Sequence, residues 1–232
     1  MRMKVANMSK WLLAGMMFYM AGCGGSASLT PVGTVVDLST FTSTYIGLPD
    51  SVPLNFPNLT GLDPQGNTLS GSLTINPSKQ TTVINNISCY STVSEVVLTQ
   101  NGVPLYDSIS TKYFKVSNNS FYSMIHTSAH GDTTYVRTSQ DSFTSGSVKV
   151  GDSGNLGIFE GSDGTRLTAT WAINADYNGG SIFVISQTYS NPAMGMNSQE
   201  DNFYLDAKGI PTKFAFRINT SEGTYKLSGE RN

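Results

Sequence analysis

Short runs in which apolar residues alternate with polar residues recur along most of the chain, and Gly, Asn, Asp or Pro bounds each run. In one run, Phe214, Phe216 and Ile218 fall on the same side, which predicts a strand with one buried face. Trp171 lies on the apolar side of another run, so we expect its indole to be buried.

The pattern predicts an antiparallel all-β protein, built as a sandwich, an open barrel or a meander. Asn101-Gly102 is expected to form a tight hairpin turn, because both residues tolerate a positive φ. From Phe41 onward, no helical spacing of apolar residues persists over three turns, so no helix is expected. Strands are predicted over 68–76, 81–90, 94–99, 112–117, 120–127, 147–150, 156–160, 166–174, 181–189, 202–206, 212–219 and 224–227.

A weak internal repeat relates the two halves of the chain. The segment beginning Gly61-Leu62-Asp63 resembles the segment beginning Gly161-Ser162-Asp163, and further matches follow at a similar offset. This suggests two related β-modules, over 41–145 and 146–232. Turn chemistry alone would produce the same similarity between unrelated hairpins.

The composition excludes several classes of protein. Hydrophobic residues make up 38% of the 232 residues and charged residues 13%, with 11 Tyr and 11 Phe. This is neither a disordered chain nor a coiled coil, a helical bundle or a polytopic membrane protein. A nucleic-acid partner is not expected, because the net charge is −2 and Lys and Arg are not clustered.

The N-terminus has the features of an export signal. Arg2, Lys4 and Lys10 supply positive charge, and residues 11–20 form an apolar run that is too short to span a bilayer as a helix. The sequence Met20-Ala21-Gly22-Cys23 then resembles the lipobox of bacterial lipoproteins, with Met in place of the commoner Leu.

The resemblance implies that residues 1–22 are a signal peptide and that Cys23 is lipidated and becomes the first residue of the mature chain. The acyl chains would hold the protein on a membrane of the cell envelope. Gly24 follows the cysteine instead of Asp, which in Gram-negative lipoproteins points to the outer membrane. Residues 23–40 are then the lipidated cysteine and a flexible tether. The alternative is an ordinary secretory signal, cut at a small-residue site.

Candidate metal ligands are few. His126 and His130 are the only histidines, and Asp132 follows closely. On a strand, the two histidines would be about 13 Å apart, too far for one ion unless the chain folds back. A polar loop without metal is the alternative, and no cofactor is expected.

A second candidate site is the connection over 191–198, which contains Met194 and Met196. These thioethers could bind copper or form an adaptable contact surface, or the segment could be an ordinary loop. Cys89 lies in a β-branched run and is expected to be a buried, unreactive thiol. Ser153, in a Gly-Asp-Ser-Gly sequence, is expected to lie in a turn, and no catalytic residue is assigned.

Three functions remain open from the sequence. The first is a membrane-anchored envelope lipoprotein that acts as a non-enzymatic binding or structural module, with a protein or glycan partner that the sequence does not identify. The second is a carrier of hydrophobic molecules, which predicts a cavity lined by apolar side chains. The third is a hydrolase, which predicts a histidine within hydrogen-bond reach of a carboxylate.

Overall fold

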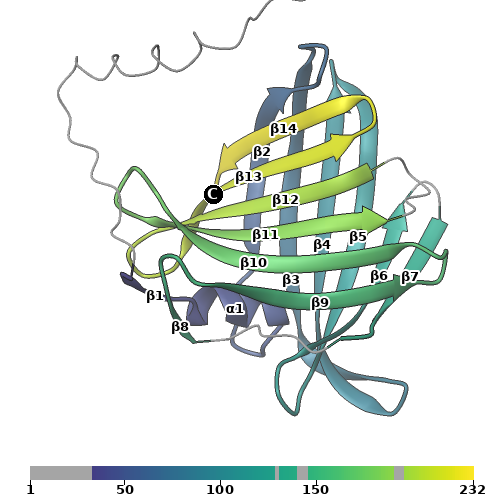
Figure 1. Cartoon of the computed structure of the whole chain (residues 1–232), viewed down its shortest axis with the longest axis vertical. Helices are drawn as coiled ribbons and strands as arrows, with labels where there is room; N and C mark the ends of the chain where they lie inside the picture. The colour runs from purple at the N-terminus through teal and green to yellow at the C-terminus, as the bar shows by residue number, and fades with distance from the viewer. Residues whose placement is uncertain (1–32, 129–130, 140–145, 191–195) are drawn as a thin grey trace, which may run out of the picture.

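The computed structural model describes residues 33–128, 131–139, 146–190 and 196–232, and it is built almost entirely of strands (Figure 1). A small sheet consists of β1 (Val35–Asp37) and β8 (Ser147–Lys149), and one helix, α1, spans Ser39–Ile46. The remaining strands are β2 (Leu54–Leu62), β3 (Thr68–Ile84), β4 (Ile87–Gln100), β5 (Val103–Lys115), β6 (Phe121–Ser128), β7 (Gly131–Arg137), β9 (Ser153–Gly161), β10 (Arg166–Ala175), β11 (Ser181–Ser190), β12 (Met196–Leu205), β13 (Pro211–Thr220) and β14 (Gly223–Glu230).

These remaining strands form one closed antiparallel barrel, in the order β10-β11-β12-β13-β14-β2-β3-β4-β5-β6-β7-β9. The predicted all-β antiparallel fold is confirmed. Pairing of β14 with β2 and of β7 with β9 joins strands from 41–145 to strands from 146–232 at two seams. The two predicted modules are therefore parts of a single barrel, and no sheet boundary lies between them.

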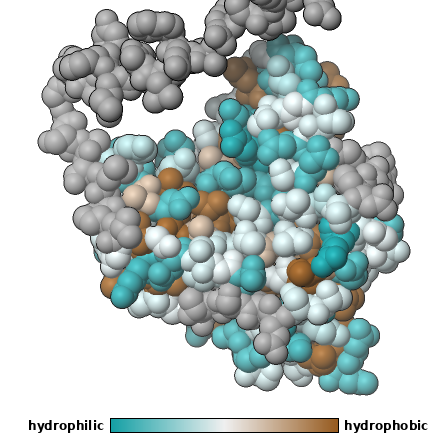
Figure 2. Space-filling view, in the orientation of Figure 1, coloured by the Kyte–Doolittle hydropathy of each residue, from teal (hydrophilic) through white to brown (hydrophobic). Residues whose placement is uncertain are grey.

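Alternation along the strands separates the inside of the barrel from the outside. Phe214, Phe216 and Ile218 are all buried, and Trp171 is 6% exposed, as predicted. The residues that alternate with these buried side chains and face outward are mostly Ser, Thr, Asn and charged residues. The surface in Figure 2 shows a mixture of polar and apolar side chains. The hydrophobic effect thus fixes which face of each strand points inward.

Residues with positive φ form the turns of two hairpins, and the sequence predicted one of these turns but not the other. Asn101 and Gly102 both have positive φ and join β4 to β5, as predicted. The single strand predicted over 81–90 is wrong, because Asn85 and Asn86 form a turn with φ values of 48° and 63°. Asn tolerates this left-handed conformation better than most residues, so the chain reverses there and passes from β3 into β4.

Helix α1 contradicts the expectation that no helix occurs after residue 41. Its sequence, STFTSTYI, has no amphipathic repeat, and five of its eight residues are buried. The ring of Phe41 lies 4.9 Å from that of Phe183 and 4.8 Å from that of Phe203, inside the barrel wall. Tertiary packing therefore stabilises this short helix, which lies at one end of the barrel (Figure 1).

The predicted tether is also too long. Residues 33–40, which the sequence assigns to it, belong to the folded body, because β1 pairs with β8 and Leu38 is fully buried. Gly209 in the β12–β13 turn packs against this segment, where a Cβ atom would come within 1.6 Å of the Asp37 carbonyl oxygen. Residues 1–22, which are predicted to be a signal peptide, and Cys23 lie outside the described residues.

Candidate functional site

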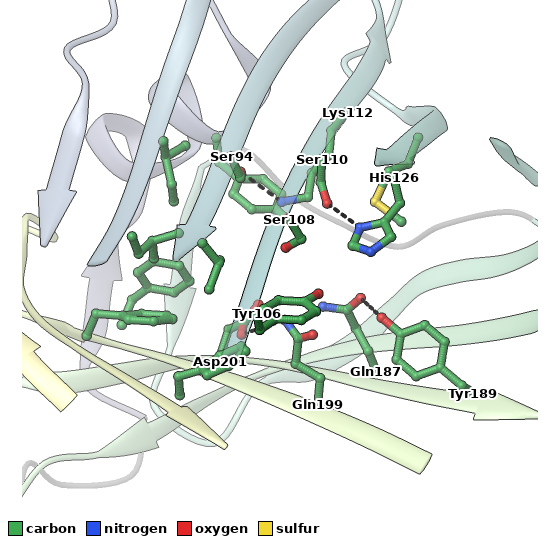
Figure 3. Close-up of a pocket in the computed structure, with 18 residues that line it drawn as sticks. Ser94, Tyr106, Ser108, Ser110, Lys112, His126, Gln187, Tyr189, Gln199 and Asp201 are labelled. Carbon is green, nitrogen blue, oxygen red and sulfur yellow. Dashed lines mark hydrogen bonds between the residues drawn. The ribbon is translucent and has the colours of Figure 1, made fainter. Parts of the chain in front are cut away.

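Side chains do not fill the interior of the barrel completely. A cavity of about 60 Å³ remains between β3–β6 on one side and β11–β13 on the other (Figure 3). Its polar lining residues are Tyr45, Ser94, Tyr106, Ser108, Ser110, Lys112, His126, Gln187, Tyr189, Gln199 and Asp201. Its apolar lining residues are Leu73, Ile75, Val96, Met124, Phe203, Phe214 and Phe216.

The cavity lies above α1 and extends toward the opposite end of the barrel. Tyr45 of α1 belongs to its lining, as does Phe203 near the end of β12 that contacts α1. Tyr189 lies one residue before the end of β11, and Ser108 pairs with Ser128, the last residue of β6. The residues that line the cavity therefore extend from the helix toward the far ends of β6 and β11.

Lys112 is the cation of the site. Strand alternation places it inside the barrel, two residues before the fully buried Phe114. Its Nζ donates a hydrogen bond to Ser94 Oγ at 3.2 Å and lies 4.8 Å from the ring centre of Tyr45. Burial lowers the pKa of this ammonium group, and the negative charge of Asp201 partly offsets the effect.

His126 forms a second polar group on the same wall. A hydrogen bond of 2.9 Å joins its Nδ1 to Ser110 Oγ on the neighbouring strand β5, where the two residues are paired across the ladder. Its Nε2 is buried and has no hydrogen-bond partner among the described residues. Burial lowers the pKa of the imidazole, and the nearby Lys112 lowers it further, which favours a neutral ring.

Asp201 is the anion of the site and projects from β12 on the opposite wall (Figure 3). Gln199 Nε2 donates a hydrogen bond to Asp201 Oδ1 at 3.0 Å. Burial raises the pKa of the carboxyl to about 6, against the lowering effects of Gln199 and Lys112. On the adjacent strand, the Tyr189 hydroxyl donates to Gln187 Oε1 at 3.0 Å.

Lys112 and Asp201 thus face one cavity from opposite walls. Each charge affects the pKa of the other. The salt bridge that joins described residues within 4.0 Å is Arg166–Glu160 on the outer surface, and no such bridge joins Lys112 to Asp201. Both residues are half-buried, and charges with restricted access to water are normally paired or hydrogen-bonded, so a solute between them would complete their interactions.

The structure separates the predicted metal ligands. His126 points into the barrel, whereas Asp132 is exposed on β7 and pairs with Thr127, whose side chain is also exposed. His130 lies outside the described residues. No group of three or more His, Cys, Asp or Glu residues that could hold a metal ion occurs in the described part of the chain.

The other predicted site residues that the structure describes do not line the cavity. Met196 is buried in β12, where it pairs with Thr220, and Met194 lies outside the described residues. Cys89 is fully buried, as expected, and burial raises the pKa of its thiol. Ser153 is the first residue of β9 and is exposed, next to the turn that contains Asp152.

Sequence reasoning missed most of the cavity because its polar residues do not form a motif. Between residues 108 and 112, polar side chains occupy both faces of β5, so alternation alone does not show which face is inward. Phe114 could have identified the inward face, because a phenylalanine on a strand is expected to point into the core. Residues two positions apart on a strand share a face, so Lys112, Ser110 and Ser108 lie on the same side as Phe114.

Comparison of the chain with models of protein families, with characterised proteins and with solved structures gives no significant match. Within the described residues, no helix is both long enough and apolar enough to cross a membrane. A function can therefore be inferred only from the residues of this chain.

Proposed function

We propose that this protein is a lipid-anchored lipoprotein of the bacterial envelope, located at the outer membrane, whose barrel binds a small polar ligand without chemical conversion. The observation that carries the binding function is the polar cavity, in which Nε2 of His126 is buried without a partner. A protein interior normally satisfies such an atom, and an incoming ligand could do so here.

The charged n-region, the ten-residue apolar run and the sequence Met20-Ala21-Gly22-Cys23 support the anchor. Residues 23–32 would then connect the lipid to a body that begins no later than β1. Mass spectrometry of the protein from the membrane fraction of a bacterial host tests this anchor. An acylated N-terminal Cys23 is expected, and Cys23→Ser should release the protein into the soluble fraction. An unmodified N-terminus would contradict it.

The composition of the cavity favours a polar ligand over a wholly hydrophobic one. A carrier of hydrophobic molecules requires an apolar lining, whereas Lys112, Asp201, His126 and two glutamines line this cavity. Placing an apolar molecule against these groups would remove their solvent without replacing its hydrogen bonds.

Met124 offers a direct test of ligand binding, because it is a methionine in the cavity lining. We would label the methionine methyl groups with ¹³C, identify the Met124 signal by its loss in Met124→Leu, and screen small polar compounds. Some compounds should shift the Met124 signal and leave that of Met196 in place.

A cavity-filling variant provides the control for this screen. Ser108→Leu should abolish the shifts, because Ser108 is 5% exposed and lines the cavity. The matched variant Ser72→Leu, on the outer face of β3 next to the inward-facing Leu73, should keep them. If no compound shifts Met124, or if Ser108→Leu responds like the wild type, the binding function is wrong.

A further inference from the structure

The charges in the cavity are arranged as a dipole. On the wall formed by β4–β6, Lys112 supplies a positive charge, and hydroxyl groups of Ser108 and Ser110 lie nearby (Figure 3). On the wall formed by β11 and β12, Asp201 supplies a negative charge beside the amide of Gln199. The two walls therefore present opposite charges to anything that lies between them.

This arrangement discriminates between ligands by charge. An anion held by Lys112 would be repelled by Asp201, and a cation held by Asp201 would be repelled by Lys112. A molecule that carries both charges gains an attraction at each wall and pairs each of these half-buried charges with an opposite one.

The size of the cavity limits the ligand. Since each water molecule needs about 10–15 Å³ of such volume, a cavity of about 60 Å³ has room for roughly four to six water-sized groups. An amino acid as small as glycine or alanine has a comparable number of non-hydrogen atoms. Phe203, Phe214 and Val96 supply apolar surface on which a short aliphatic group could lie.

We propose that the cavity binds a small zwitterion of the amino-acid class, with its carboxylate toward Lys112 and its ammonium group toward Asp201. Ser108 and Nε2 of His126 would complete the carboxylate end, and Gln199 and Tyr106 the ammonium end. In the tautomer with the proton on Nε2, the Ser110 hydroxyl donates to Nδ1 and orients the imidazole. This inference rests on the proposed binding function and specifies the ligand class of the same site.

The test compares glycine with its two charged halves, acetate and methylammonium, by titration against the Met124 methyl signal of the full-length protein. Glycine should bind at least about tenfold more tightly than either half. If acetate or methylammonium binds as tightly as glycine, the inference is overturned. If other polar compounds shift Met124 and glycine does not, the inference fails while the binding function stands. If nothing shifts Met124, both fail.

Removal of one of the two charges should change which of glycine, acetate and methylammonium binds most tightly. Lys112→Met should make methylammonium the tightest of the three probes, and Asp201→Asn should make acetate the tightest. Lys213→Met is a matched control, because Lys213 also lies over a tyrosine ring, that of Tyr204, at 5.1 Å, but on the outer face. Asp107→Asn, on the exposed face of β5, is the control for Asp201→Asn.

A measurement on the wild-type protein keeps the test independent of how well these variants fold. At about pH 5.5 the carboxyl of Asp201 is largely protonated, so the preference should move from glycine toward acetate relative to pH 7.5. Lys112 faces Asp201 across the cavity, and Glu200 lies next to Asp201 on β12. Protonation of His126 would change the preference in the same direction. A preference that does not change with pH would contradict the inference.

Discussion

The ammonium group of Lys112 on β5 lies 4.8 Å from the ring centre of Tyr45 on α1. A cation above an aromatic face is attracted by the electrons of the ring, and the attraction is stronger when both groups are removed from water. The helix at the end of the barrel thus closes the core and also supplies one wall of the cavity.

Phe41 should be the residue through which α1 contributes most to stability. It is fully buried and contacts rings on β11 and β12. Phe41→Ala should lower the free energy of unfolding by about 3–5 kcal/mol in urea denaturation. Val35→Ala, in the adjacent β1 where Val35 is 61% exposed, should change it by less than about 0.5 kcal/mol. Equal effects of the two changes would mean that α1 is not packed into the barrel.

Trp171 should report on the core of the second half of the barrel. It is 6% exposed and its ring stacks near that of Phe183, so Trp171→Ala should cost about 3–5 kcal/mol. Its indole Nε1 is buried without a hydrogen-bond partner in the described structure, so Trp171→Phe should cost clearly less.

Fluorescence provides a second measurement at this position. Trp11 lies in the predicted signal peptide, so in protein that lacks residues 1–22 the tryptophan emission comes from Trp171 alone. A short-wavelength emission maximum is expected from the buried indole, and Tyr177→Ala, at a residue 67% exposed, should leave both emission and stability unchanged. An emission maximum typical of water-exposed tryptophan would show that Trp171 is not buried in the barrel.

Ionisation of the Asp201 carboxyl should change the free energy of unfolding as the pH rises. Because its pKa is raised from 3.8 to about 6 in the folded protein, folding favours the protonated carboxyl. Its ionisation therefore destabilises the folded state, an effect that is absent below about pH 4 and complete above about pH 6.

Asp201→Asn removes this ionisation. The free energy of unfolding of the variant, relative to the wild type, should rise between these pH values by no more than about 3 kcal/mol. Carboxyls with a lowered pKa, such as Asp63, act in the opposite direction but are common to both proteins. A difference that stays constant with pH, or falls, would show that the pKa of the Asp201 carboxyl is not raised in the folded protein.

The hydrogen bond between Ser110 and His126 should not make Ser110 a nucleophile. Ser110 lies within β5, paired with Ser94 on one side and His126 on the other, so the ladders use the backbone N–H groups around it. An acyl-transfer site also requires free donors for the oxyanion. A fluorophosphonate probe should label neither Ser110 nor Ser153. Stoichiometric labelling at either residue would contradict the non-enzymatic function and favour the hydrolase.

The sequence predicts the fold class because one face of most strands is apolar, as in the run that contains Phe214 and Phe216. It does not predict closure of the barrel, because the pairing of β14 with β2 joins residues far apart in the chain and leaves no local pattern. It also misses α1, whose Ser- and Thr-rich sequence becomes helical only where Phe41 packs against the barrel.

The cavity was only partly predictable, because its residues are far apart in the sequence and form no local pattern. His126 was recognised as a candidate from its residue type, but as a metal ligand with Asp132, which lies on the opposite face of the sheet. The distance in sequence between Lys112 and Asp201 hides their relationship, which the closed barrel alone creates.

A crystal structure of the protein grown with alanine tests most directly whether the barrel holds a solute between Lys112 and Asp201. Electron density for one alanine is expected in the cavity, with its carboxylate near Lys112 and its ammonium group near Asp201. A cavity filled by side chains, or one that contains only water at a saturating alanine concentration, would contradict this expectation.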